Sequence, residues 1–394
     1  MDSRRAVSGT GRMNRMDRSG RARRVRRGFL ARRAAEVVVL LAGGTMVLGP
    51  ALGADRILLR KLEVISDRTV VSFDEDGVVL DDHRVLAWDE IEKATVSNGQ
   101  AEFDTMLGEL GSALYRIRQR LSVGDVEGLS EPVESIYPRY TARRGRTAHL
   151  VFQAVVRSRL AAGRRESAVE PYLLLLECRR SVENPGEALP VPGEHPIVPD
   201  PATGLCDALE PIWFDADAAR RELPRVGAAI GAMRRPWPPG APIYYASLAA
   251  AAGETDRMLA ALGELSGDAW TPWRDIIEAF GECARGEPGP AWSRLDGHEP
   301  AEAGLRRAAA LYVSGRGAIL RGADRRDAAI KLLRVPALYG TAYPELAAAA
   351  LHDAMKGLSD LEDIPASVAV RNELLGQFGA THHARIVRRE ATPP

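Results

Sequence analysis

The stretch RLAAGRRESAVEP (159–171) has a counterpart earlier in the chain, RLSVGDVEGLSEP (120–132), with Arg, Leu, Gly, Glu and Pro in the same register. The shared offset of 39 residues continues past both prolines, where it pairs Val133 with Tyr172 and Ile136 with Leu175. Apolar residues spaced three and four apart lie on one face of a helix. Each copy therefore predicts a helix, a turn at its glycine, and a second helix with a buried apolar face.

The glycine and the proline of each copy have different expected roles. Gly124 and Gly163 mark the turns, while Pro132 and Pro171 are expected near the start of the second helix, where a missing backbone N–H costs least. Helix hairpins that recur every roughly 30–45 residues are typical of α-solenoids, whose units bury their apolar faces by stacking on neighbours. The sequence thus predicts a mainly α fold, an α-solenoid of helix hairpins.

Changes in composition divide the chain into five parts. The predicted parts are a signal peptide (1–54), a small β segment (55–97), helix-hairpin repeats (101–181), a proline-rich linker (182–206) and further helical repeats (207–390). The linker contains NPGEALPVPGEHPIVPDPATG (184–204), in which neither a helix nor a central strand can persist. We expect it to be either a boundary or a long ordered excursion.

The N-terminal part has the order of a secretory signal. Residues 1–33 hold 12 arginines, and the apolar run VVVLLAGGTMVLGPALGA (37–54) follows them. The basic region contains a sequence that resembles the twin-arginine export motif, carried by Arg26, Arg27, Phe29 and Leu30. That resemblance implies export of an already folded protein, to the periplasm or the cell envelope.

Small residues at the end of the apolar run favour cleavage after Gly53, which would leave no membrane span. The alternative is an uncleaved membrane anchor of about the minimum spanning length. The long leader also leaves open whether Met13 or Met16 is the true start.

Residues 55–97 contain five short runs rich in Val, Ile, Leu and Thr, separated by turn sequences. Asp-Gly at 76–77 is typical of a hairpin, because glycine accepts the positive φ that the turn requires. VLAWDEIEKATV (85–96) resembles the closing strands of Sm-like and SH3-like small β-barrels, with a final strand beginning near Ile91. A segment this short is marginal alone, so we expect it to pack on the helical part.

The last third of the chain resembles tetratricopeptide-repeat proteins. LYVSGRGAILRGADRRDAAIKLL (311–333) carries Gly315 in its first helix, Gly322 at the turn and Ala328 in its second helix, with one residue more than that pattern between Gly322 and Ala328. NELLGQFGATHHA (372–384) is similar to the closing repeat of exported bacterial proteins of this type. The resemblance implies a superhelix that binds proteins, without identifying a partner.

Charge argues against a nucleic-acid ligand. The formal net charge is zero, but without residues 1–54 the chain carries 41 basic and 50 acidic residues. Nucleic-acid binding requires a basic footprint that releases counterions from the phosphates. Only four lysines accompany 49 arginines, so arginine-rich patches carry little weight as evidence for a site.

Motifs for catalysis, cofactors and metals are missing from the sequence. GxSxG, HExxH, Walker and dinucleotide patterns do not occur, so we predict no catalytic, cofactor-binding or metal residue. His382 and His383 are the best metal candidates, but adjacent residues on a helix diverge by about 100°, which favours a polar tail instead.

Cys178, Cys206 and Cys283 have no regular spacing. An oxidising compartment would permit one disulfide, whereas isolated cysteines are more often small core residues. Trp270 and Trp273 are three residues apart. Exposed together they would bind a peptide or sugar, and the alternative is that they pack helix ends into the core.

We therefore expect a non-catalytic interaction or scaffold protein of the cell envelope, whose partner is a protein or peptide. The alternative is an envelope hydrolase or carbohydrate-processing enzyme with a site built from scattered carboxylates. A buried Asp or Glu pair in a cleft would favour the enzyme, and a groove without perturbed acids would favour the scaffold.

Overall fold

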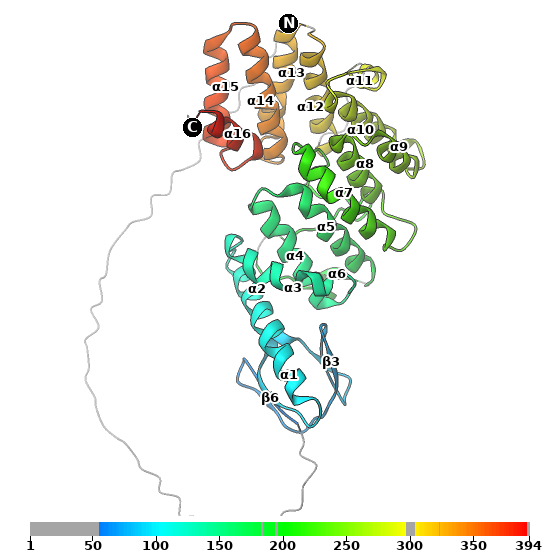
Figure 1. Ribbon diagram of the computed structural model, residues 1–394, viewed down its shortest axis with the longest axis vertical. Coiled ribbons are helices and arrows are strands. Elements are labelled where there is room, and N and C mark those ends of the chain that lie inside the picture. The colour runs from blue at the N-terminus through cyan, green and yellow to red at the C-terminus, as the bar shows by residue number, and fades with distance from the viewer. Residues whose placement is uncertain (1–54, 183, 194–195, 297–303, 323, 392–394) are drawn as a thin grey trace, which may run out of the picture. The chain divides into compact units, whose positions relative to one another are not determined.

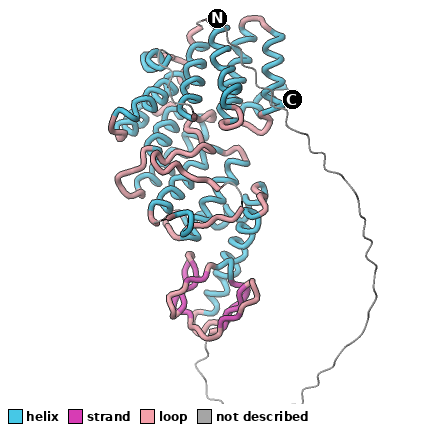
Figure 2. The backbone as a smooth tube through the Cα atoms, turned by 180° about the vertical axis from the view of Figure 1, so that it is seen from behind, coloured by secondary structure: helices cyan, strands magenta, loops and turns pink. Residues whose placement is uncertain are grey.

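Two small antiparallel sheets precede the helices in the computed structural model, which describes residues 55–391 except 183, 194–195, 297–303 and 323 (Figure 1). The sheets have the strand orders β2-β1-β6 and β3-β4-β5 and are drawn in magenta in Figure 2. Their strands are β1 (Arg56–Leu59), β2 (Val64–Ile65), β3 (Val70–Asp74), β4 (Gly77–Leu80), β5 (Val85–Leu86) and β6 (Ile91–Thr95). The export motif at residues 26–30 lies outside the described residues.

The strand pattern differs from the prediction at one place. The first predicted strand, ILLRKLEVI (57–65), is two strands, because the chain reverses at Leu62, which has a φ of 68° and donates its N–H to Leu59 O. The predicted hairpin is confirmed, since Asp74 pairs with Gly77. The final strand begins at Ile91 as predicted, after the 3₁₀-helix η1 (Trp88–Glu90).

The β3–β4 hairpin docks onto the helices through one arginine. Arg143 forms ion pairs with Asp74 (2.8 Å), Asp76 (2.9 Å) and Glu75 at the hairpin turn. Close by, Tyr140 donates its hydroxyl to Glu75 O at 2.7 Å. The expectation that the β segment packs on the helical part is therefore confirmed.

Consecutive helices pack against one another along the chain (Figure 1). The first group is α1 (Gln100–Met106), a π-helical turn η2 (Leu107–Gly111), α2 (Ser112–Ser122), the 3₁₀-helix η3 (Glu127–Leu129), α3 (Ser130–Tyr140), α4 (Arg146–Ala161), α5 (Arg165–Arg180) and the short α6 (Pro185–Ala188). The second group is α7 (Ala216–Gly231), α8 (Gly240–Ala252), α9 (Thr255–Gly263), the 3₁₀-helix η4 (Asp268–Trp270), α10 (Thr271–Ala284), α11 (Pro290–Asp296), α12 (Leu305–Leu320), α13 (Arg325–Tyr339), α14 (Pro344–Asp360), α15 (Ile364–Gln377) and α16 (His382–Ala391). The mainly α prediction is confirmed, and no described helix has the length and apolarity needed to cross a membrane.

The helices of the second group form two sets. Helices α8, α10, α12 and α14 pack on one another in order, and α9, α11, α13 and α15 each pack on their neighbours in sequence. Gly315 permits the close approach of α12 and α13, because a Cβ there would lie 2.7 Å from Leu332. Gly322 has a φ of 64° at the turn, and Ala328 is buried. The predicted positions of these three residues in a helix pair are confirmed.

The same glycine turn ends the first helix of both sequence copies. Gly124 and Gly163 have φ of 72° and 67°, and each donates its N–H to the carbonyl three residues before it. The following residue, Asp125 or Arg164, donates to the carbonyl of Arg120 or Arg159. This pair of bonds is the Schellman motif, which needs a left-handed residue. The turns of the two copies are thus equivalent in backbone conformation.

Pro171 corrects one prediction. It does not lie at the start of its helix but at the seventh residue of α5. A proline there leaves the carbonyl of Ser167 without its usual N–H donor. Arg159 supplies the donor instead, because its Nη1 lies 2.6 Å from Ser167 O. Pro132, at the third residue of α3, lies where the sequence predicts it.

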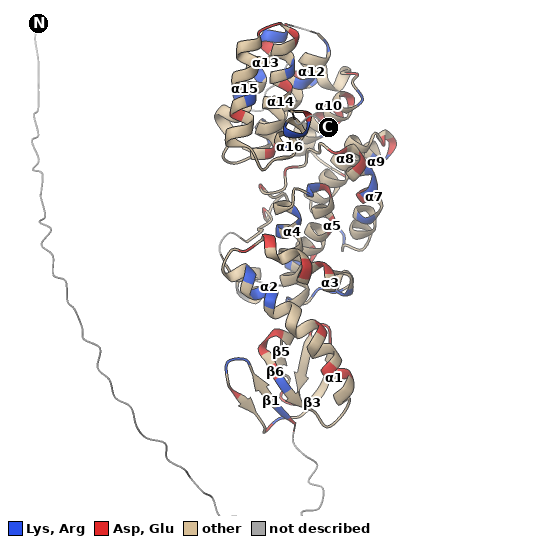
Figure 3. Ribbon diagram, turned by 60° about the vertical axis from the view of Figure 1, so that its left-hand side comes forward, with Lys and Arg blue, Asp and Glu red and all other residues tan. Residues whose placement is uncertain are grey.

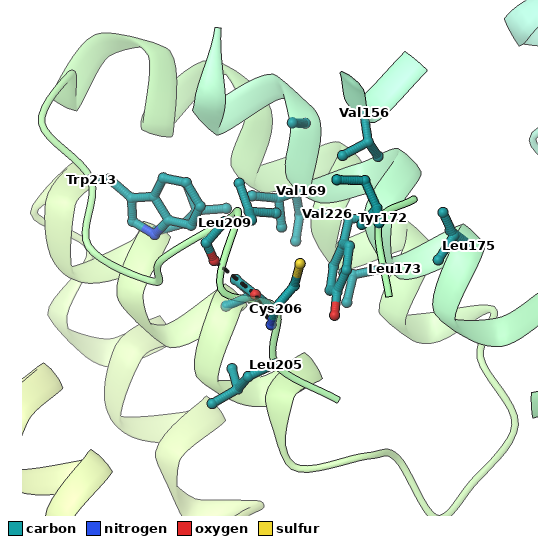
Figure 4. Close-up of a cluster of buried hydrophobic side chains, with 14 of the residues drawn as sticks. Val156, Val169, Tyr172, Leu173, Leu175, Leu205, Cys206, Leu209, Trp213 and Val226 are labelled. Carbon is teal, nitrogen blue, oxygen red and sulfur yellow. Dashed lines mark hydrogen bonds between the residues drawn. The ribbon is translucent and has the colours of Figure 1, made fainter. Parts of the chain in front are cut away.

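The proline-rich segment continues as an ordered excursion packed on the helices. The Gln153 side chain of α4 exchanges two hydrogen bonds with the backbone of Ile197, at 2.6 and 2.9 Å. The hydroxyls of Tyr172 and Tyr244 donate to Gly204 O and Leu209 O. Figure 4 shows Leu205 and Cys206 at the end of this segment, and Leu209 and Trp213 just after it, gathered beside Val169 and Tyr172 of α5.

Replacing Gly124 with alanine should destabilise the fold by about 1–2 kcal/mol, because the added Cβ is strained at positive φ. No atom lies within 4 Å of the new Cβ, so the loss reports the backbone alone. The matched control is Gly376→Ala within α15, which should be neutral or stabilising, since alanine is the better helix former. Urea unfolding of both variants measures the difference, and equal midpoints would contradict the assigned conformation.

Candidate binding site at the α7–α8 loop

The loop between α7 and α8 (residues 232–239) is fixed by a buried carboxylate. Glu177 of α5 is 2% exposed and accepts hydrogen bonds from Arg234 Nε at 2.7 Å and from Arg180 Nη1 at 2.9 Å. Arg180 also donates to the carbonyls of Arg234 (3.0 Å) and Pro236 (2.8 Å). Charge-assisted bonds of this kind are about twice as strong as neutral ones. The loop is therefore held to α5 at three points.

An apolar groove lies beside this loop. The groove has a volume of about 300 Å³ and is formed by α7, α8, α9 and the loop, and we call it the α7–α9 groove. Its lining residues are Gly227, Ile230, Gly231, Trp237, Pro242, Tyr245, Arg257, Ala260, Ala261 and Glu264. Small residues leave the space open, because a Cβ on Gly231 would meet nothing within 4 Å. The groove has room for a group of side-chain size.

Trp237 is an aromatic wall of the α7–α9 groove. Its indole Nε1 is buried and has no hydrogen-bond partner among the described residues. A buried donor without an acceptor costs free energy, roughly 1–3 kcal/mol. On the ring, the Arg235 guanidinium stacks 4.0 Å from the centroid, and it pairs with Glu264 at 3.4 Å. The indole is thus held in place at the wall of the groove.

Charge around the groove is mixed. Figure 3 shows acidic and basic residues interspersed along the helices. At the groove itself, Arg257 and Glu264 carry opposite charges. A surface of this kind suits a polar backbone flanking an apolar side chain better than it suits a polyanion.

The histidines named in the sequence analysis lie in a second cluster, at the contact of α12, α14 and α16. His383 is 5% exposed, and its ring lies 4.8 Å from that of His352 and 4.7 Å from that of Phe214. The predicted polar tail is therefore wrong for His383, because α16 turns this side chain into the core. Burial and the neighbouring His352 hold the pKa of His383 well below its usual range.

Asp353 is the acid of this cluster. It accepts a hydrogen bond from the Tyr312 hydroxyl at 3.2 Å, and Arg316 donates to the same hydroxyl at 2.7 Å. His352 Nδ1 lies 3.5 Å from Asp353 Oδ1 without hydrogen-bond geometry. No set of three His, Cys, Asp or Glu side chains in the described part of the chain is arranged to hold a metal. The cluster is a packed interior contact.

The remaining predicted residues have clear positions. Trp273 is 4% exposed in α10, and Trp270 is half-buried against the same core, so the two rings are not exposed together. The burial of the two rings agrees with the alternative interpretation, in which they pack helix ends into the core. Binding of a partner by Trp270 and Trp273 stays a prediction. Cys178, Cys206 and Cys283 are all free and buried.

Sequence reasoning missed the residues that build the α7–α9 groove. RRPWPPGAP (234–242) interrupts the helices, and its tryptophan was the available signal. The partner of that loop, Glu177, lies 57 residues before Arg234, and no local pattern connects the two.

Comparison of the chain with protein-family models, with curated protein sequences and with solved structures finds no match.

Replacing Glu177 with glutamine should release the α7–α8 loop, because the amide cannot neutralise Arg180 and Arg234. We expect a loss of roughly 1–3 kcal/mol and faster trypsin cleavage after Arg234. The control is Glu264→Gln at the end of α9, whose exposed ion pair with Arg235 of the same loop contributes little. Equal cleavage rates in both variants would contradict the anchoring role of Glu177.

His149 should make the protein less stable in acid. Burial, helped by the charge of Arg179, lowers the pKa of His149 to about 4. The unfolded chain binds the proton near pH 6.5, so stability is full above that pH and falls toward pH 4, by about 3 kcal/mol in total.

Urea unfolding at pH 7 and pH 4.5 tests this effect of His149. His149→Gln should lose less stability between the two pH values than the unchanged protein does. The exposed His83→Gln variant is the control and should keep the full acid loss. An unchanged pH dependence in His149→Gln would refute the assignment.

Proposed function

We propose that this protein is an exported, non-catalytic interaction protein of the cell envelope, and that the α7–α9 groove binds a peptide segment of its partner. The observation that carries the proposal is the apolar groove walled by the aromatic rings of Trp237 and Tyr245. An apolar side chain of the peptide would fill the groove. The export part of the proposal rests on the sequence of residues 1–54 alone.

The geometry of the groove supports a peptide over a free apolar molecule. Tyr245 and Trp237 provide rigid aromatic walls, a residue type enriched at binding hot spots. Around them, Arg257 and Glu264 offer a donor and an acceptor at the same groove. A peptide backbone has both kinds of group, whereas a hydrocarbon has neither.

The packing of the helices also favours an interaction role. Successive helices stack with short turns, so each pair adds surface without closing the structure around a single interior site. Proteins built in this way use extended surfaces for binding. More specifically, we propose that the helix pairs bind their partner as tetratricopeptide repeats do. Gly315, Gly322 and Ala328 support this because they lie in the first helix, at the turn and in the second helix, as in that repeat pattern.

The alternative, a hydrolase built from scattered carboxylates, has one observation in its favour. Burial raises the pKa of Glu170, with a smaller contribution from Glu222. Burial also raises the pKa of Glu210, but Arg165 covers that carboxylate. Neither Glu170 nor Glu210 lines the α7–α9 groove or the cavity at the C-terminal end of α5. A catalytic acid must reach its substrate, so we favour the interaction role.

Filling the groove tests the proposal. A displayed random-peptide library selected on the full chain provides ligands, whose affinity is then measured for Gly231→Leu and for the control Gly376→Leu. Both changes put leucine where a helical glycine has open space, so both variants should fold. Gly231→Leu should weaken binding about tenfold or more, and Gly376→Leu should not.

Trp237→Ala tests the aromatic wall by a second route. The indole that lines the groove is lost, so peptide affinity should fall by roughly 2 kcal/mol. A selection that yields no saturable ligand, or ligands that bind Gly231→Leu as tightly as the unchanged chain, would overturn the proposal.

A further inference from the structure

Arg179 of α5 is a half-buried cation without a partner. Its guanidinium makes no hydrogen bond, ion pair or ring contact with the residues that the structure describes, which sets it apart from its neighbour Arg180. Burial lowers the pKa of Arg179, and no carboxylate opposes that effect. Removing a cation from water without a counter-charge is costly.

Arg179 lines a small cavity. This cavity, the Arg179 cavity, has a volume of about 220 Å³ between the end of α5, the proline-rich excursion and the α7–α8 loop. The other lining residues are Leu176, Arg180, Pro185, Pro199, Asp200, Pro201, Gly204 and Pro238. Prolines have no N–H to donate. The two arginine side chains are therefore the groups in the cavity that can donate hydrogen bonds to an acidic ligand group.

Of the two arginines, Arg179 is the one available. Arg180 already binds Glu177 and two loop carbonyls. Asp200 is also engaged, since its Oδ1 accepts from the backbone N–H and the hydroxyl of Thr203, both at 2.7 Å. Those hydrogen bonds lower the pKa of Asp200, so its carboxylate is ionised and adds a negative charge to the wall.

We propose that the Arg179 cavity binds a monocarboxylate with a short apolar chain, its carboxylate paired with the Arg179 guanidinium. A carboxylate matches the planar donor fork of arginine with two parallel hydrogen bonds. Leu176 and the prolines then contact the apolar chain. The cavity volume of about 220 Å³ suits a small ligand.

The charges select a monoanion over a phosphate. One free guanidinium compensates one negative charge, and a dianion would bring a second charge toward Asp200. Two sources offer the same chemistry, a free short-chain acid and the C-terminal residue of a peptide. The cavity shares no residue with the α7–α9 groove, so either proposal can fail alone.

Calorimetric titration of the full chain tests the cavity. Butyrate should bind saturably, while butyramide and inorganic phosphate should bind at least about tenfold more weakly. Arg179→Gln should lower butyrate affinity about tenfold or more, and Arg179→Lys should recover part of it, because the charge returns without the fork. A tripeptide ending in valine, with a free or an amidated C-terminus, distinguishes the two sources.

The matched control is Arg157→Gln. Arg157 on α4 is likewise desolvated, with an Nη1 that has no partner among the described residues, but it does not line the cavity. This variant should bind butyrate as the unchanged chain does. A second readout is the pKa of His149, which the charge of Arg179 helps to lower and which butyrate should raise in the unchanged chain but not in Arg179→Gln.

Three results would overturn the assignment: no saturable butyrate binding, phosphate binding as tight as butyrate, or equal loss of binding in Arg157→Gln and Arg179→Gln.

Discussion

A glycine with left-handed backbone conformation ends a helix at five places in the described chain. Gly124, Gly163, Gly253, Gly286 and Gly322 have φ between 64° and 79°. Any other residue would carry a penalty of roughly 1–2 kcal/mol at each turn. The tight reversal brings the next helix back along the first, so that their apolar faces meet without a long loop. The stacking of the helices, and the cavities at their ends, follow from this local constraint.

Arginines then connect elements that the turns bring together. Arg143 joins the β hairpin to the helices, Arg159 joins α3, α4 and α5, and Arg180 holds the α7–α8 loop. Each uses several N–H donors of one rigid plane, which the single ammonium of lysine would not reproduce. The excess of arginine over lysine, which carries no information about a site by itself, thus has a structural use at these positions.

The local features of the fold were predictable from the sequence, and the contacts between distant segments were not. Gly124 and Gly163 could be assigned to turns because glycine has no Cβ and adopts a positive φ without strain, and the Asp-Gly hairpin followed from the same rule. The pairing of Glu177 with Arg234 depends on tertiary packing, which has no periodic signal.

Two expectations failed for related reasons. His383 looked like part of a polar tail, but α16 packs on α14 and buries it. Pro171 looked like a helix start, but a side chain from another helix made an interior position acceptable. For the candidate site, RRPWPPGAP was visible as an interruption, whereas the unpaired Nε1 of Trp237 is a property of the folded surroundings.

The hydrogen bond from Arg159 to the Ser167 carbonyl makes the residues tolerated at positions 159 and 171 depend on each other. A chain with an ordinary residue at 171 supplies its own backbone donor, so it no longer needs the arginine for this bond. A chain with the proline alone leaves the partly buried Ser167 carbonyl without that donor. Substitutions at positions 159 and 171 are therefore coupled. Pro171 must first be replaced by a residue with a backbone N–H, and only then can Arg159 be lost without leaving the Ser167 carbonyl without a donor.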